Sequence, residues 1–303
     1  MYAFETERFD TALAVVEKAM IMHAVPVRTE RWQGKDIQGL PAAEMREVRN
    51  MMFEVNCRST EADNLDVLRT QCKPNLPWAD DHFEERVSGH PLNPGVEWAN
   101  WPWAKNADQF RQGRFNHNYM ERYWPRYARC TDDGALPLSF SMHERRYPRR
   151  NNDTAAHSGI GHVYGDIQSV IELLVEQPYT RQAYIPIFFP EDTGTGDGGR
   201  KPCTLGYHFL LRDCEEHDAD WYGLPELHVW YPMRSCDVAH HLRDDVYMTM
   251  RLALWILERC RQRRPEFWEN VHFGSFSMHA TSMHMFVNDW HQLNKRLRKE
   301  GKL

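Results

Sequence analysis

The sequence lacks the patterns that mark several common protein classes. Its seven cysteines never form a C-x-x-C pair, which argues against a zinc ribbon or a thioredoxin-type dithiol. Every apolar run falls short of the roughly 20 residues that a membrane span needs. The first residues, M-Y-A-F-E-T-E-R-F-D, show no basic stretch followed by an apolar one, as a signal peptide would. We therefore expect a reduced protein located in the cytoplasm.

Motifs of several catalytic sites are also missing. There is no G-x-G-x-x-G and no G-x-x-x-x-G-K-[ST], so neither a dinucleotide fingerprint nor a P-loop is expected. No H-E-x-x-H accompanies the histidines, and no G-x-S-x-G surrounds Ser277 or Ser282. The net charge of −6 argues against a nucleic-acid polymer as the partner. These absences leave a metal-free site for a small molecule as the expectation.

The composition is that of a globular protein. Of 303 residues, 42% are apolar and 12% aromatic, enough to build a large core. Residue periodicity predicts helices over 8–24, 42–56, 165–177 and 245–263, strands over 181–189, 204–212 and 227–234, and a strand running into a helix over 271–288. We expect one α/β (α+β) domain over 1–303, with an irregular, aromatic-rich region over 74–160 and a solvated polar tail.

Cys203 is the first candidate for chemistry. It follows a glycine-rich loop and precedes a predicted strand, and Arg200 and Lys201 beside it favour the nucleophilic thiolate. Position alone also allows a structural cysteine, because free cysteines are often simply buried. Arg181 and the pair Arg234-Ser235 lie at the ends of predicted strands. Their guanidinium and hydroxyl groups suit a phosphate. The alternative is that each arginine is an ordinary surface residue.

Five motifs together resemble the thymidylate synthase family, including its phage deoxycytidylate and deoxyuridylate hydroxymethylase branches. They are H-V-Y-G-D-I (162–167), P-Y-T-R-Q (178–182), K-P-C-T (201–204), M-R-S-C-D…D (233–245) and S-M-H-M-F-V-N (282–288). Their order is that of the family, and the match covers about residues 160–290. The resemblance implies a large twisted mixed sheet flanked by helices, and a dimer formed sheet to sheet.

The resemblance also implies an activity and roles for residues. The enzyme would transfer a one-carbon unit from 5,10-methylenetetrahydrofolate to C5 of a pyrimidine nucleoside monophosphate, with Cys203 adding to C6. Arg234 and Ser235 match the phosphate-binding pair, and Arg181 matches an arginine that the partner subunit donates to the same phosphate. An enzyme completed in this way is a symmetric dimer.

Further substrate-binding residues follow from the same motifs. Tyr164 matches the tyrosine of the nucleotide-site motif, His284 looks like the histidine near the sugar, and Asp237 is the aspartate of R-S-x-D. Glu47 is the best match to the catalytic glutamate, and Glu44 and Glu54 remain alternatives.

The chain also departs from the family pattern. Thr204 replaces the histidine after the nucleophile, Gln182 the second arginine of a pair, Met233 a glutamine, and Phe286 the sugar-site tyrosine. These changes place the chain outside mainstream thymidylate synthases, and they leave the choice between deoxyribose and ribose open.

The departure that concerns the base is Asp245, eight residues after Asp237, where thymidylate synthases have an asparagine. An ionised carboxylate only accepts hydrogen bonds, so it suits the amino group of cytosine and repels O4 of uracil. The deoxycytidylate hydroxymethylase branch is similar in having aspartate there. The alternative for Asp245 is a plain acid at a helix N-terminus, a role that Asp244 fills equally well.

We therefore expect a dCMP hydroxymethylase that makes a precursor of modified phage DNA, acting in the host cytoplasm if it is phage-encoded. The alternatives are a dCMP methyltransferase, a dUMP hydroxymethylase, an atypical thymidylate synthase, a CMP hydroxymethylase and a non-catalytic nucleotide-binding relative. The intact Cys203, Arg234 and Ser235 argue against the last of these.

Overall fold

The computed structural model describes residues 2–32, 35–58, 62–89, 95, 119–125, 165–189, 192–194, 201–215 and 222–303. Its helices are α1 (Phe9–His23), the 3-10 turn η1 (Pro41–Ala43), α2 (Leu65–Cys72), α3 (Trp78–Val87), α6 (Tyr119–Tyr123), α8 (Ile167–Glu176), α9 (Leu242–Arg263), α10 (Pro265–Trp268) and α11 (Val287–Lys299). Its strands are β1 (Tyr2–Thr6), β2 (Val25–Val27), β3 (Arg31–Trp32), β4 (Lys35–Asp36), β5 (Met45–Asn56), β6 (Tyr184–Pro186), β7 (Gly206–Asp213), β8 (Pro225–Asp237) and β9 (His272–Phe286).

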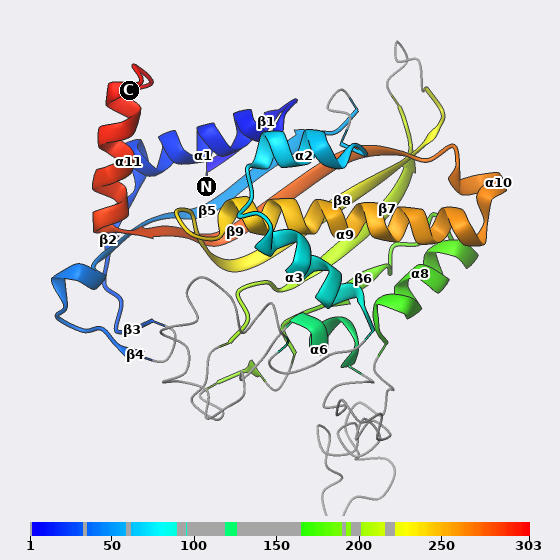
Figure 1. Cartoon of the computed structure of the whole chain (residues 1–303), viewed down its shortest axis with the longest axis horizontal. Helices are drawn as coiled ribbons and strands as arrows, with labels where there is room; N and C mark the ends of the chain where they lie inside the picture. Colours follow the sequence, from blue (N-terminus) through cyan, green and yellow to red (C-terminus); the bar gives the residue numbers. More distant parts are fainter. Residues whose placement is uncertain are drawn as a thin grey trace, which may run out of the picture.

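A seven-stranded mixed sheet organises the described part of the chain. The strand order is β1-β5-β9-β8-β7-β6, with β2 paired to β5. The pairs β1–β5 and β8–β9 are parallel, and the others are antiparallel. Helix α9 lies across the sheet, with α2 and α3 beside it (Figure 1). This confirms the expected α/β class and the large mixed sheet flanked by helices.

Helices α1 and α9 close the core against the sheet. The ring of Phe9 in α1 lies 5.7 Å from the ring of Phe276 in β9, and both side chains are buried. Helix α9 buries a continuous apolar row that includes Val246, Met250 and Ile256. Burying each such side chain contributes about 1.5–3 kcal/mol relative to leaving it in water. The helices thereby hold one face of the sheet rigidly in place.

Most of the predicted elements around the site motifs are confirmed. The predicted helix over 8–24 is α1, and the helix over 165–177 is α8, where Asp166 caps the first turn by accepting from the Ser169 amide at 3.0 Å. The helix predicted from residue 245 is α9 and begins three residues earlier, at Leu242. The stretch 271–288 is strand β9 running into α11.

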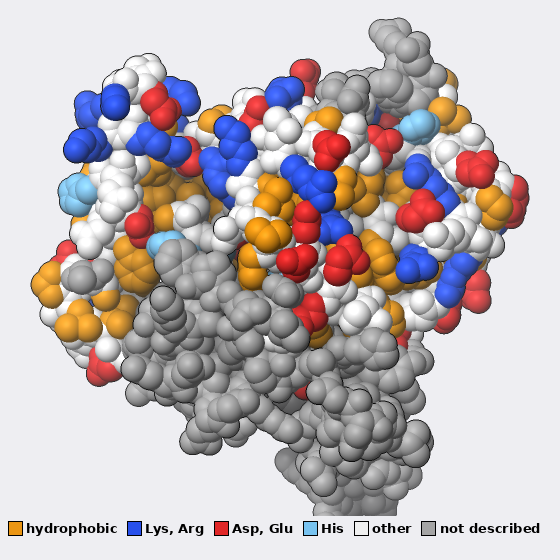
Figure 2. Space-filling view, in the orientation of Figure 1, with side chains coloured by type: hydrophobic (Ala, Val, Ile, Leu, Met, Phe, Trp, Pro, Cys, Tyr) orange, Lys and Arg blue, Asp and Glu red, His pale blue; other side chains and the backbone are white. Residues whose placement is uncertain are grey.

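Four predictions about local structure are wrong or only partly right. Residues 42–56 form strand β5 rather than a helix, and only Tyr184–Pro186 of the predicted strand 181–189 is a strand. The region after residue 74, expected to be irregular, contains helix α3. The polar tail is mostly exposed, as expected, but it is helical as far as Lys299 and buries Leu297. Figure 2 shows Lys and Arg side chains gathered on the outside of α11, which is why its sequence looks fully solvated.

Candidate active site

Three neighbouring strands carry polar side chains in two adjacent rows. Glu47, His284 and Asp237 face one another across β5, β9 and β8. Arg49, Ser282 and Ser235 form the next row of the same strands. Residues directly opposite each other in a sheet point to the same face, as do residues two apart in a strand. All six side chains therefore share one face at one end of the sheet.

The alternation of buried and exposed positions is interrupted just before these rows. Two successive residues are exposed or half-buried in each strand: Arg49–Asn50 in β5, Thr281–Ser282 in β9 and Arg234–Ser235 in β8. Asn50 adopts a left-handed conformation with φ 52°, which few residue types other than glycine and asparagine tolerate. Such irregularities re-aim side chains locally. Here they give the sheet a polar end.

Cys203 lies against this polar end, on the segment that leads into β7. Its carbonyl oxygen accepts from the Arg234 amide at 2.9 Å, which fixes the segment to β8. The Ser235 hydroxyl lies 3.5 Å from Cys203 Sγ, and Nη2 of Arg234 lies 3.7 Å from it. The sulfur is half-buried. A hydroxyl and a guanidinium therefore both donate toward the sulfur.

Arg234 is held by backbone atoms of the cysteine segment. Its Nε donates to the carbonyl of Pro202 at 2.8 Å, and Nη2 donates to the carbonyl of Lys201 at 2.9 Å. The side chain is nevertheless exposed, so it can also meet an anion from solvent. The sequence led us to expect Arg200 and Lys201 as the charges beside the sulfur. Arg234 is the guanidinium that reaches it, and Arg200 lies outside the described residues.

The serines extend the site to Glu47. Ser235 and Ser282 are direct neighbours in the sheet, and the Ser282 hydroxyl donates to Glu47 Oε2 at 2.7 Å. Glu54 instead accepts from Ser277 farther along the same strands. Glu47 is therefore hydrogen-bonded to the serine row that leads to Cys203, and Glu54 is not. Glu44, the third candidate, precedes β5, and its carbonyl oxygen accepts from the Val287 amide.

His284 and Asp237 lie next to Glu47 in the first polar row. The buried Asp237 carboxylate accepts from His240 Nδ1 at 2.9 Å and from the amide of Ala239 at 3.1 Å. Burial alone would raise the pKa of Asp237, but the hydrogen bond and the charges of His240 and His284 bring it below its ordinary value. In turn, the hydrogen bond to Asp237 raises the pKa of His240. This pair fixes the turn that connects β8 to α9.

The two acids at the start of α9 have different surroundings. Asp244 is buried, and its Oδ1 accepts from the amide of Asn75 at 2.7 Å. Burial raises the pKa of Asp244. Asp244 therefore ties the segment between α2 and α3 to α9, which is more than the simple helix-start role expected from the sequence. Asp245 is half-buried, and its Oδ2 lies 4.0 Å from Sγ of Cys236 in β8.

A buried hydroxyl network lies behind the cysteine segment. The Thr204 hydroxyl lies 2.8 Å from the Tyr119 hydroxyl and 2.9 Å from the Tyr231 hydroxyl. Burial raises the pKa of Tyr119, and the negative charges of Asp245 and Cys203 raise it further. Asp245 in α9 and Cys203 in the segment before β7 thus both raise the pKa of the Tyr119 hydroxyl. In the sequence, Thr204 was notable only because it replaces the family's histidine after the nucleophile. No sequence pattern pointed to Tyr119, which is far from Thr204 in the chain.

The remaining predicted site residues are Tyr164 and Arg181. Tyr164 lies outside the described residues. Arg181 is exposed, and its carbonyl oxygen lies 3.1 Å from His208 Nε2. His208 is five residues beyond Cys203, on an extended strand that rises about 3.3 Å per residue. Arg181 therefore lies away from the cysteine of its own chain.

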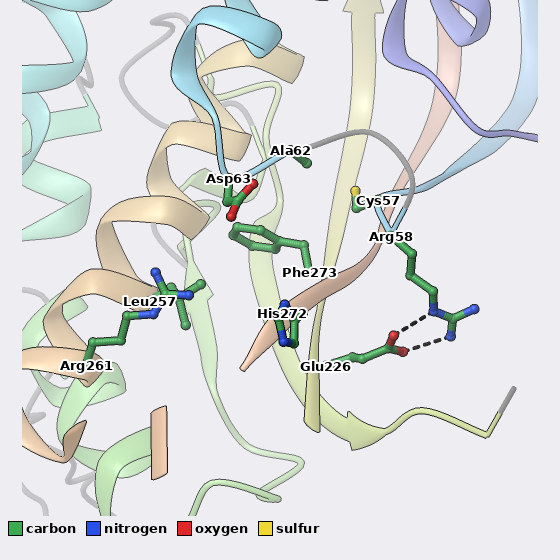
Figure 3. Close-up of a pocket in the computed structure, with 9 residues that line it drawn as sticks. All are labelled: Cys57, Arg58, Ala62, Asp63, Glu226, Leu257, Arg261, His272 and Phe273. Atoms are coloured by element: carbon green, nitrogen blue, oxygen red, sulfur yellow. Dashed lines mark hydrogen bonds and ion pairs between the residues drawn. The ribbon is translucent and has the colours of Figure 1, made fainter. Parts of the chain in front are cut away.

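A separate cavity of about 200 Å³ lies at the other end of β8 (Figure 3). Arg58 and Glu226 form a bidentate ion pair at its edge, with distances of 2.6 and 2.8 Å. Glu226 is buried, so this pair ties the end of β5 to the start of β8. None of the predicted site residues lines this cavity.

In comparisons with known proteins, no family model and no curated protein matches this sequence. No helix in the described part of the chain is long and apolar enough to cross a membrane. Within the same residues, no group of three or more His, Cys, Asp or Glu side chains is arranged to hold a metal ion.

Proposed function

We propose that this protein is a folate-dependent one-carbon transferase that acts on C5 of a pyrimidine nucleoside monophosphate, with dCMP as substrate and a hydroxymethyl group as product. One observation carries the proposal. Cys203 Sγ lies 3.5 Å from Ser235 Oγ and 3.7 Å from Arg234 Nη2, and the adjacent Ser282 connects this group to Glu47. A nucleophile, an anion-binding pair and a carboxylate thus lie together, although their positions range from 47 to 282 in the chain.

The chemistry follows from the roles of these groups. Cys203 forms a bond to C6 of the pyrimidine, and the electron pair of the C5–C6 double bond moves to C5. C5 would then bond to the one-carbon unit that 5,10-methylenetetrahydrofolate supplies; loss of the C5 proton, with cleavage of the carbon–nitrogen bond and departure of tetrahydrofolate, leaves an exocyclic methylene group. Water adds to the resulting exocyclic methylene group, and cleavage of the C6–sulfur bond returns the thiolate. Glu47, held by the Ser282 hydroxyl, is placed to orient water and relay the proton.

The substrate is recognised at both ends in this proposal. Arg234 and Ser235 hold the phosphate, because a guanidinium fork and a hydroxyl match its oxygens. Asp245 accepts from the amino group of cytosine. His284 lies beside Glu47 and contacts the sugar.

The folate would bind near the same end of the sheet. A cavity of about 470 Å³ adjoins the start of β5, and its lining combines the apolar Leu40 and Met45 with Arg28 and Arg46. Folate is a flat aromatic molecule with a glutamate tail, and this mixture of groups suits it. Arg28 and Arg46 would hold the tail carboxylates.

The second subunit completes the site in this proposal. Arg181 lies away from the cysteine of its own chain, as an arginine that serves the neighbouring subunit must. Met52 and Trp230 are 40% and 39% exposed, and their positions share one face of the sheet. Large apolar side chains exposed together on a sheet face suit an interface. A dimer formed sheet to sheet would cover them.

Covalent trapping tests the proposal. With 5-fluoro-dCMP and methylenetetrahydrofolate, loss of the C5 proton is blocked, so the adduct should persist. Mass spectrometry should find both ligands on the peptide that contains Cys203. Cys57→Ser, which removes a thiol at the other end of the sheet, should still be trapped, and Cys203→Ser should not. Trapping that is unchanged in Cys203→Ser would refute the assignment of the nucleophile.

A further inference from the structure

Thr204 has two tyrosine partners to which the mechanism assigns no role. Its side chain is fully buried, and its Oγ1 lies 2.8 Å from the Tyr119 hydroxyl and 2.9 Å from the Tyr231 hydroxyl. Tyr119 belongs to α6 and Tyr231 to β8, so hydroxyls from three distant parts of the chain meet at one point. Buried hydroxyls are costly unless they are hydrogen-bonded, and a threonine hydroxyl can both donate and accept. From this position, Thr204 bonds both phenols at once.

The rings of both tyrosines are held by further contacts. The guanidinium carbon of Arg86 lies 4.1 Å from the centre of the Tyr119 ring, an attractive arrangement of a cation and an aromatic face. The Tyr207 ring stacks on the Tyr231 ring, with centroids 5.2 Å apart. Helix α6 is anchored as well, because the Arg122 side chain donates to a carbonyl oxygen and a carboxylate in the segment after β6. The two phenols are therefore fixed points to which Thr204 is attached.

Thr204 lies in the same fixed segment as the nucleophile. The Leu205 amide donates to a β8 carbonyl at 2.9 Å, and the Cys203 carbonyl accepts from the Arg234 amide of β8 at 2.9 Å. Thr204 itself forms an antiparallel bridge to β8. Successive side chains of an extended segment point to opposite faces, so Cys203 Sγ lies against Ser235 Oγ while Thr204 points to the tyrosines. Releasing the Thr204 side chain would therefore also loosen the backbone that directs the sulfur.

We propose that Thr204, bonded to Tyr119 and Tyr231, holds the Cys203 sulfur at the position from which it attacks the pyrimidine. The inference rests on the proposed function and deepens it. A misplacement of about 1 Å can slow a reaction about a hundredfold, so an anchor on the residue next to the nucleophile has a large effect on the rate. Because its side chain is fully buried, Thr204 is a positioning residue that acts through Cys203.

The test separates the rate of covalent attack from nucleotide binding. Cys203 is trapped with saturating 5-fluoro-dCMP and methylenetetrahydrofolate, and mass spectrometry follows the rate constant of adduct formation. Thr204→Val keeps the shape but loses the hydroxyl, and it should lower this rate constant by at least about tenfold. The Kd for dCMP, measured by calorimetry, should change by less than about threefold, because the groups that bind the nucleotide remain. A rate constant does not depend on the fraction of folded protein, so a purely structural threonine would leave it unchanged.

Three further variants locate the effect. Thr204→Ser keeps the hydroxyl and should stay within about threefold of the wild-type rate constant. Tyr119→Phe should slow trapping, and adding it to Thr204→Val should slow it no further, because that bond is already lost. Tyr123→Phe is the matched control: this tyrosine is buried in the same helix, but its hydroxyl does not bond to Thr204, so trapping should be unchanged.

The outcomes separate this inference from the proposed function. If wild-type Cys203 forms no adduct, the proposed function fails and the inference fails with it. If the wild type forms the adduct and Thr204→Val forms it equally fast, or if the Val and Ser variants slow by the same factor, the inference alone is overturned. If Thr204→Val does not fold, Tyr119→Phe and Tyr231→Phe decide, because each removes one bond. Rate constants equal to that of Tyr123→Phe would then overturn the inference.

Discussion

An aspartate and an asparagine have nearly the same shape but present different hydrogen-bonding groups, and in the proposed function the choice of base depends on this difference at Asp245. The residue lies at the start of α9, next to Cys236 of the strand that carries Arg234 and Ser235. Its neighbour Asp244 is turned toward Asn75 instead. The sequence could suggest that these two acids differ. Only the structure shows that one is used for packing and the other faces the buried network around Cys203.

Asp245→Asn should move the substrate preference from dCMP toward dUMP, by at least about tenfold in the ratio of the two kcat/KM values. The amide donates to O4 of uracil and accepts from N3–H, and it no longer accepts two bonds. The measurement is steady-state kinetics with both nucleotides. Asp244→Asn is the matched control: it should leave the ratio unchanged and lower stability by about 1–3 kcal/mol, because it weakens a buried bond to the Asn75 amide.

The pair formed by His240 and Asp237 predicts a pH dependence of stability. The pKa of His240 is raised, so its contribution is complete below the ordinary histidine value and is lost as the pH rises through the raised value. The pKa of Asp237 is lowered, so its contribution is lost as the pH falls through that lowered value. His240→Ala should therefore cost about 1 kcal/mol near pH 6 and much less near pH 9, measured by urea denaturation. A cost that is the same at both values would contradict the pairing.

At the scale of elements, β5 shows why the sequence was misleading. Its buried residues Met45, Val48 and Met51 are three apart, the spacing of a helix, and its residues are good helix formers. The spacing arises because the strand's alternation is interrupted twice, at Arg46–Glu47 and at Arg49–Asn50, in the polar end of the sheet. Pairing with β9, distant in the chain, then outweighs local propensity. Hydrophobic spacing therefore predicts the wrong element in the strand that carries part of the candidate site.

The strands and helix around the motifs could be predicted, and the contacts between them could not. Strands β7 and β8 and helix α9 have clear periodicity, so the sequence could place Cys203 just before β7, Arg234 in β8 and Asp245 at the start of α9. The Ser235–Ser282 pairing depends on register between strands, and Tyr119 comes from a distant helix without a recognisable motif. No local pattern encodes contacts of this kind.

Helix α11 provides a prediction about the tail. Leu297 is buried, Trp290 Nε1 donates to the Met20 carbonyl at 3.0 Å, and Arg296 pairs with Glu17 at 2.6 Å. Leu297→Ala should therefore lower the free energy of unfolding by about 2–3 kcal/mol, the usual cost of such a cavity. Lys295→Ala, on the exposed side of the same helix, should change it by less than about 0.5 kcal/mol in chemical denaturation. Equal effects would show that α11 does not pack on α1.

At the scale of the whole molecule, the account needs two chains for each complete site. The exposed Met52 and Trp230 mark the sheet face that a second copy would cover, and Arg181 would then reach the partner's phosphate. Mixing Arg181→Ala with Cys203→Ser protein should restore activity, because each mixed dimer contains one site with both residues intact. Random exchange of equal amounts gives about a quarter of wild-type activity. Two inactive variants that stay inactive after confirmed exchange would contradict a shared site.

The most direct measurement is the mass of the reaction product. The protein is incubated with methylenetetrahydrofolate and, separately, with dCMP, CMP or dUMP, and each nucleotide is weighed by mass spectrometry. The account predicts that dCMP gains the mass of one CH2O unit and that the reaction stops in Cys203→Ser. A gain of CH2 would make the enzyme a methyltransferase, and a gain on dUMP rather than dCMP would refute the role of Asp245. No gain on any of the three nucleotides would contradict the central claim.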